Sequence, residues 1–112
     1  MTPTTLFNSS VAYAPTGPVC LIPETKQGVV TFLSITNADT SDNTVVLSRL
    51  SDSQSLSVSD ASEVLRVDVS AGSCITKKIF VAIKGGDQLF LAATADNTTP
   101  CTAYMSGYFA EV

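Results

Sequence analysis

The stretch KGGDQLFLAAT, from Lys84 to Thr94, places two glycines beside a lysine and an aspartate, residue types that can hold a phosphate or a metal ion. A phosphate-binding glycine loop is followed by a helix, whose N-terminus presents oriented N–H groups to the anion. Here Gly85 and Gly86 are followed by DQLFLAAT, a run typical of a strand. We therefore interpret the two glycines as a tight corner between strands, where positive φ angles are needed.

Proton-transfer chemistry has few candidates, because the chain contains no histidine. Ser-His-Asp and Cys-His arrangements and histidine zinc sites are therefore excluded. The acidic residues Asp39, Asp42, Asp52 and Asp60 lie in Ser/Thr/Asn-rich stretches, where carboxylates keep a loop solvated. The segment DTSDN (39–43) offers oxygen ligands but lacks the glycine of a calcium loop. We predict that the protein is not an enzyme and holds neither a metal ion nor another cofactor.

The charge pattern argues against nucleic acid as a direct partner, and the lack of a long apolar segment argues against membrane. The net charge is −4, and the six basic residues are scattered, with only Lys77 and Lys78 adjacent. Proteins that bind phosphate backbones need a concentrated basic surface. No window approaches the roughly 20 apolar residues of a membrane span, and the first residues lack the features of a signal peptide. We expect neither secretion nor membrane anchoring.

The three cysteines, Cys20, Cys74 and Cys101, are odd in number and far apart in the sequence. Each lies beside or within an apolar run, which is typical of a small buried thiol. We predict that all three are buried and unpaired in a reducing compartment.

These residues must be positioned by strands, because no segment has a convincing helical period. The 112 residues suffice for one domain with its own core. VLRVDVS (64–70) alternates apolar and polar residues, and GVVTFLSIT (28–36) and TVVLSRL (44–50) are β-branched runs that we expect to form a hairpin. About seven such strands predict an all-β fold, a single antiparallel β-sandwich, with a jelly roll favoured over an immunoglobulin-like arrangement.

Four prolines within the first 23 residues predict that residues 1–17 form an extended N-terminal arm and residues 18–112 the sandwich domain. We expect the arm to become ordered against a neighbouring subunit through its apolar side chains, Leu6, Phe7, Val11 and Tyr13. The serine-rich segment Ser51 to Glu63 fits either a flexible loop or a polar strand that pairs with a neighbour.

The final stretch, CTAYMSGYFAEV (101–112), reads as a strand with two different faces. Cys101, Ala103, Met105, Gly107 and Phe109 form the set that we assign to the core. Tyr104 and Tyr108 then point outward with Thr102 and Ser106, and outward tyrosines are enriched where subunits meet. Two other interpretations stay open: the tyrosines merely cover the sheet, or the faces are reversed.

The C-terminal third, with GGDQLFLAAT followed by YMSGYF, is similar to the end of trimeric jelly-roll modules of the C1q and tumour-necrosis-factor type. Over about residues 18–110, VVTFLSITNADTSDNTVVLSRL, VSAGSCITKKIFVAIKGGDQLFLAA and CTAYMSGYF resemble small β-sandwich virion proteins of tailed bacteriophages. The first resemblance implies a homotrimer, which we place at Tyr104 and Tyr108.

The second resemblance implies a structural virion protein, assembled in the host cytoplasm. Its expected role is capsid decoration or cement, in which it stabilises the phage head by clamping neighbouring capsid subunits. The expected partner is the major capsid protein or another virion protein. The alternative is a tail, neck or fibre component, including a module that binds a host glycan. The chain has no tryptophan and three tyrosines, which is a poor supply of aromatic platforms for a glycan.

Overall fold

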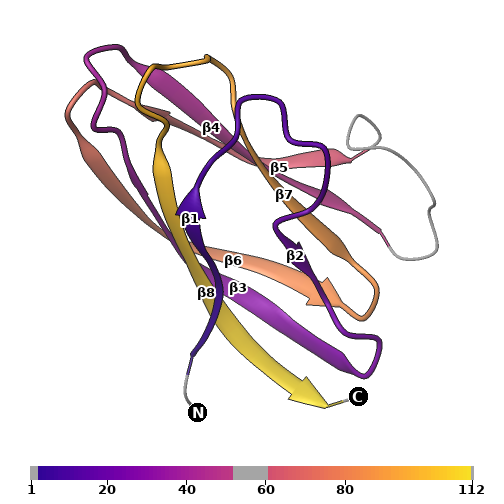
Figure 1. Ribbon diagram of the computed structural model, residues 1–112. Coiled ribbons are helices and arrows are strands. Elements are labelled where there is room, and N and C mark those ends of the chain that lie inside the picture. Colours follow the sequence, from indigo (N-terminus) through magenta and orange to yellow (C-terminus); the bar gives the residue numbers. More distant parts are fainter. Residues whose placement is uncertain (1–2, 52–60, 112) are drawn as a thin grey trace.

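The computed structural model describes residues 3–51 and 61–111, and the described chain forms two antiparallel four-stranded sheets packed face to face (Figure 1). The described part contains no helix, and therefore none long and apolar enough to cross a membrane. The predicted all-β antiparallel sandwich is confirmed. The strands are β1 (Thr4–Ser10), β2 (Cys20–Leu21), β3 (Lys26–Thr36), β4 (Asn43–Leu50), β5 (Ser62–Val69), β6 (Cys74–Lys84), β7 (Gln88–Ala93) and β8 (Thr102–Glu111).

One sheet has the strand order β1-β8-β3-β6 and the other has the order β2-β7-β4-β5. Only β4 and β5 are both consecutive in the sequence and hydrogen-bonded to each other among the described strands. The choice between a jelly roll and an immunoglobulin-like arrangement stays a prediction at this point. Residues 52–60 of the serine-rich segment lie outside the described residues.

The predicted hairpin of residues 28–36 and 44–50 is wrong, because β3 and β4 belong to different sheets. Asn37, which is fully buried, shapes the connection between them. Its Nδ2 donates to Ser41 O at 2.9 Å and to Val69 O at 3.0 Å, and its Oδ1 accepts from Asp39 N at 3.1 Å. These bonds hold the chain in an arch that crosses from one sheet to the other.

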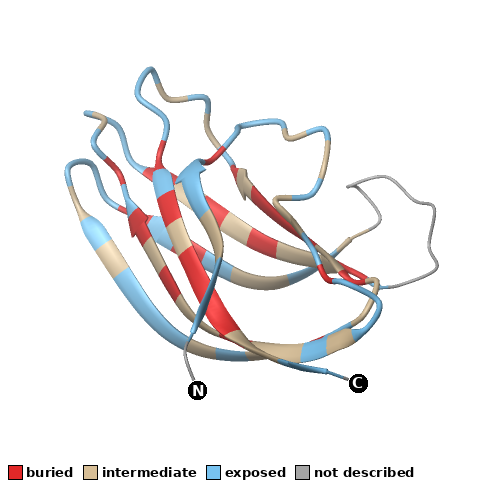
Figure 2. Ribbon diagram, turned by 60° about the horizontal axis from the view of Figure 1, so that its bottom comes forward, coloured by how far each residue is buried: buried red, intermediate tan, exposed pale blue. Residues whose placement is uncertain are grey.

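The core lies between the sheets and is built from alternate residues of the strands, which Figure 2 shows as buried segments between exposed ones. In β5, Val67 and Val69 are buried, whereas Arg66 and Asp68 are exposed, as the alternation predicts. Full burial of each such aliphatic side chain stabilises the fold by about 1.5–3 kcal/mol. Other core members are Val30, Leu33, Ile35, Val45, Leu47, Leu89, Leu91 and Met105.

Part of the predicted extended N-terminal arm, residues 1–17, is a strand of the sandwich. Residues 4–10 form β1, which pairs with β8 from Thr4↔Gly107 to Ser10↔Thr102. Val11 is 1% exposed, and its N–H donates to Cys101 O at 2.8 Å. The physical reason is the placement of the prolines: Pro3 precedes the strand and Pro15 and Pro18 follow it. The strand itself therefore keeps the N–H groups needed for pairing.

The interpretation of Gly85 and Gly86 as a corner is confirmed. Gly86 has a φ of 88°, and Asp87 N donates to Lys84 O at 3.1 Å, which closes a turn from β6 to β7. This turn packs on the chain before β3, where Ile22 N donates to Asp87 O at 2.9 Å and Gly86 N to Ile22 O at 2.8 Å. These hydrogen bonds hold Asp87 to the end of β6 and to the segment that precedes β3.

Candidate functional site

The outer face of the β1-β8-β3-β6 sheet, which points away from the second sheet, carries the predicted tyrosines. In β8, Ala103 and Met105 are 3% and 0% exposed, so they face the core. Tyr104 and Tyr108 alternate with them and lie half-buried on the opposite face. The assignment of Cys101, Ala103, Met105 and Gly107 to the buried set is confirmed, and Phe109 packs against the core from its rim.

Tyr104 is held in place by the strands on either side of β8. Its ring meets the ring of Phe32 in β3 edge to face, with centroids 5.9 Å apart and an interplanar angle of 70°. Its hydroxyl lies 3.3 Å from Thr5 Oγ1 in β1. Such an aromatic pair is worth about 0.5–1.5 kcal/mol beyond the area that it buries. Tyr104 is therefore a fixed part of the surface.

Phe80 of β6 is the most exposed large apolar side chain among the described residues, at 81%. It lies on the same outer face, because its neighbours Ile79 and Val81 pack against the core. We call the set Phe32, Phe80, Tyr104 and Tyr108 the aromatic face. Sequence reasoning missed Phe80, although the alternation of ITKKIFVAI already places it opposite Ile79, Val81 and Ile83.

The strand order decides how this face can bind another protein. β8 lies between β1 and β3, and it is paired on both sides from Thr102 to Gly107, whereas Tyr108 to Glu111 are paired with β3 alone. Tyr104 can therefore contribute to an interface through its side chain only. The edges of this sheet are β1 and β6, and Phe80 belongs to the second of them.

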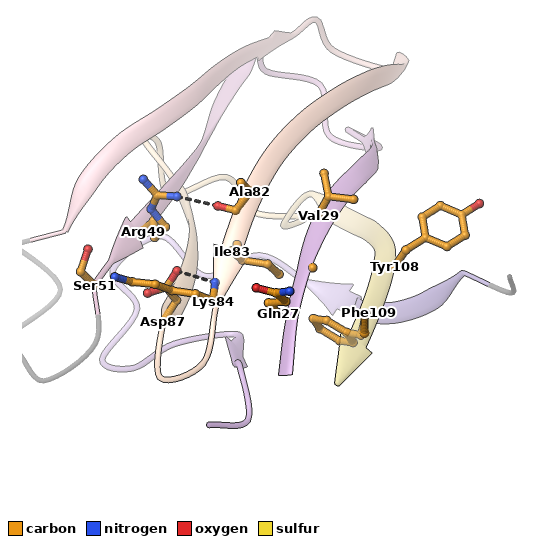
Figure 3. A pocket seen from close by; sticks show the side chains of 12 residues that line it. Gln27, Val29, Arg49, Ser51, Ala82, Ile83, Lys84, Asp87, Tyr108 and Phe109 are labelled. Atoms are coloured by element: carbon orange, nitrogen blue, oxygen red, sulfur yellow. Dashed lines mark hydrogen bonds between the residues drawn. The ribbon is translucent and has the colours of Figure 1, made fainter. Parts of the chain in front are cut away.

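A cavity of about 670 Å³ opens at the end of the sandwich where the strands of both sheets meet (Figure 3). From the first sheet it is lined by the starts and ends of β3, β6 and β8, including Val29 and Phe109. The second sheet contributes Arg49, and the β6–β7 turn contributes Asp87. Arg49 Nη1 donates to Ala82 O at 2.6 Å and so joins β4 to β6 across the two sheets.

Arg49, Lys84 and Asp87 are the charged residues that line this cavity, and of these three Asp87 is buried, with 2% of its surface exposed. Its Oδ2 accepts a hydrogen bond from Lys84 N at 3.0 Å. Its Oδ1 is buried and has no hydrogen-bond partner within the described part of the chain. Sequence reasoning used Asp87 only as a corner residue, and no sequence signal reports an unpartnered oxygen, because it depends on how distant segments pack.

Most of the side chains predicted as arm contacts pack within the protein itself. Leu6 and Phe7 pack against the core, and Val11 belongs to it. Tyr13 is 52% exposed and lines a smaller cavity of about 370 Å³ together with Val11. Of the four predicted arm contacts, Tyr13 is the one whose side chain is mainly available to a partner.

The cysteines are unpaired, as predicted, but they are not all buried. Cys101 is buried and Cys20 half-buried, and burial raises the pKa of both thiols. Cys74, at the start of β6, is exposed. Its pKa is lowered, because the Thr36 hydroxyl donates a hydrogen bond to its sulfur at 3.3 Å, with Ser34 Oγ at 3.7 Å. The prediction of a buried thiol is wrong for Cys74, since the strand register puts it on the outer face.

The described residues offer recognition by apolar contact and hydrogen bonding. Within residues 3–51 and 61–111, no three His, Cys, Asp or Glu side chains gather as metal ligands would. A scan against protein-family models and a search of characterised proteins found no match to this chain. The aromatic face and the cavity are therefore the features from which a function can be inferred.

Proposed function

We propose that the chain is a structural virion protein of the capsid decoration type, which forms a homotrimer through its aromatic face and stabilises a phage head by binding neighbouring capsid subunits. The observation that carries the assembly is Phe80, 81% exposed on a face that also holds Tyr104 and Tyr108. Monomeric proteins rarely expose large contiguous apolar patches, and aromatic residues are enriched at subunit interfaces. The virion assignment is supported by the resemblance of residues 18–110 to small phage β-sandwich proteins.

We infer further that the sandwich is a jelly roll. Every connection between consecutive strands except β4–β5 passes from one sheet to the other. Two interleaved Greek keys of eight strands give this kind of alternation. In the immunoglobulin fold, by contrast, neighbours in sequence such as A and B or F and G pair within one sheet. The strand order therefore supports the same class of trimeric modules that the YMSGYF ending resembles.

Burial of the aromatic face would contribute favourable free energy to assembly. An aromatic side chain buries about 150–250 Å² in an interface, at about 25 cal/mol per Å², so covering Phe80 yields roughly 3–5 kcal/mol before costs. Association consumes part of this gain through lost rotational and translational freedom. Because a trimer repeats the contact at each of its interfaces, the remaining gain accumulates. The half-buried tyrosines add hydroxyl groups that can remain hydrogen-bonded in the interface.

Sedimentation equilibrium of the purified protein tests the assembly. We expect a trimer for the wild type, and dissociation toward monomer for Phe80→Ser, Tyr104→Ser and Tyr108→Ser. The matched control is Leu21→Ser, which removes another exposed apolar side chain, 63% accessible, from β2 of the opposite sheet. The control should remain a trimer. A monomeric wild type, or a Phe80→Ser variant that associates as tightly as the wild type, would contradict the proposal.

The place of the protein in the particle is tested by cryo-electron microscopy of virions that contain it. We expect density for the protein on the capsid surface, clustered around threefold positions. Density confined to the tail, neck or fibre would favour the alternative role and overturn capsid decoration. Mass spectrometry that finds none of the protein in purified particles would refute the virion assignment itself.

A further inference from the structure

We propose that the cavity around Asp87 is a carbohydrate-binding site that takes a neutral sugar unit. Its volume of about 670 Å³ falls within the roughly 300–1,000 Å³ of small-molecule sites. It is an open cavity bordered by both sheets and by the β6–β7 turn. This inference does not rest on the proposed assembly, because the residues that define it lie at the end of the sandwich.

The unpartnered oxygen of Asp87 is the observation that points to a ligand. Nine-tenths or more of polar groups buried in proteins have a hydrogen-bond partner, and a buried acceptor without one destabilises the fold. Asp87 is 2% exposed, and only its Oδ2 is paired within the described chain. A ligand that donates a hydrogen bond to Oδ1 would complete the carboxylate. Asp87 thus has an unsatisfied hydrogen-bond acceptor, as expected of a residue that binds a ligand.

The other polar groups of the cavity define the kind of ligand. Arg49 carries five N–H donors, of which one on Nη1 is given to Ala82 O. Lys84 also lines the cavity, as does the hydroxyl of Ser51 (Figure 3). Arg49 and Lys84 would repel a cationic ligand, and the carboxylate of Asp87 would repel an anionic one. A neutral ligand that both donates and accepts hydrogen bonds avoids both repulsions.

Sugar hydroxyls satisfy this requirement, because each one donates and accepts at the same time. Adjacent hydroxyls could donate to Asp87 Oδ1 and accept from a cationic side chain. The apolar face of a sugar ring could lie on Phe109, which lines the cavity from the core side of the sheet. Tyr108 also borders the cavity, but Figure 3 shows its hydroxyl directed away from Asp87.

The test is a titration of the isotope-labelled full chain with four sugars: methyl α-glucoside, methyl α-mannoside, methyl β-galactoside and N-acetylglucosamine. Binding is followed by the backbone amide signals in two-dimensional NMR. We expect at least one sugar to shift the amides of Gly28, Asp87 and Phe109. No shift of these amides with any of the four sugars would overturn the proposal.

Two variants make the test specific. Asp87→Asn keeps an oxygen that can accept from Lys84 N, so the turn should stay folded, but it replaces the other oxygen by an amide. Its affinity for the sugar should fall about tenfold or more, and Arg49→Met should weaken binding in the same direction. Asp68→Asn is the matched control, because Asp68 is an exposed carboxylate of β5 outside the cavity. Wild-type affinity in both Asp87→Asn and Arg49→Met, or an equal loss in Asp68→Asn, would refute the site.

Discussion

Replacement of Gly107 by alanine adds one methyl group at a point where β8 approaches β3 closely. A Cβ at this position would lie 2.2 Å from Val29 O and 3.0 Å from Val30 Cα. Both neighbours are backbone atoms, so neither can rotate away, and the two strands must move apart by about 0.8 Å to restore the shortest normal distance. Gly107 faces Val30 in the ladder, directly before the irregularity between Val30 and Phe32.

The expected cost follows from these contacts. Overpacking costs about 1–3 kcal/mol, and weakening two ladder hydrogen bonds costs about 1 kcal/mol each. Alanine recovers about 0.5–1 kcal/mol, because it loses less backbone entropy than glycine on folding. The free energy of unfolding should therefore fall by about 3 kcal/mol, which corresponds to a drop of roughly 10 °C in Tm for a domain of this size.

Urea unfolding followed by circular dichroism measures this difference. Gly17→Ala is the matched control, since a Cβ there meets nothing within 4 Å. The control should change the free energy of unfolding by less than about 0.5 kcal/mol. If Gly107→Ala is as stable as Gly17→Ala, the close packing of β3 and β8 is not as the structure has it. The glycine of YMSGYF would then need another explanation.

Three further outcomes are expected. Asn37→Ala, which removes three hydrogen bonds of a buried side chain, should cost about 2–3 kcal/mol in urea unfolding; a loss equal to that of the exposed Asn8→Ala would contradict this. Iodoacetamide should alkylate Cys74 before Cys20 and Cys101, as followed by mass spectrometry of the modified peptides. The rate at Cys74 should fall as the pH drops through its lowered pKa, and Thr36→Val should move this pH profile to higher pH. Earlier modification of Cys20 or Cys101 would contradict this. Deletion of residues 1–10 should lower Tm markedly, because it removes β1, one of the two strands that pair with β8; an unchanged Tm would show that β1 does not stabilise the sandwich.

The elements and their faces could be predicted because they depend on local alternation. Val67 and Val69 of VLRVDVS lie inside and Arg66 and Asp68 outside, and the last strand has its tyrosines on the outer face, as the period of two requires. The assignment of strands to sheets could not be predicted in the same way. β3 and β4 look like a hairpin in sequence, yet β3 pairs with β6 and β8, and β4 pairs with β5 and β7. That choice is made by how both sheets close over one core.

The candidate functional surfaces also differ in how far the sequence could predict them. The exposure of Phe80 follows from alternation, once Ile79 and Val81 are placed inside. The unpartnered oxygen of Asp87 could not be predicted, because it results from the meeting of β4, β6 and the β6–β7 turn. The prolines of the first 23 residues predict an extended arm, but they lie on either side of β1, which contains none and can therefore pair.

Hydroxyl-radical footprinting of the assembled and the dissociated protein tests most directly whether the aromatic face is the assembly interface. The readout is the rate at which peptides containing Phe80 and Tyr108 are oxidised, and Leu21 and Tyr13 serve as internal references, at 63% and 52% exposure. We predict that assembly lowers the oxidation of Phe80 and Tyr108 severalfold and leaves Leu21 and Tyr13 unchanged. Equal oxidation of Phe80 in both states, with protection at Leu21 or Tyr13 instead, would place the interface elsewhere and contradict the proposed assembly.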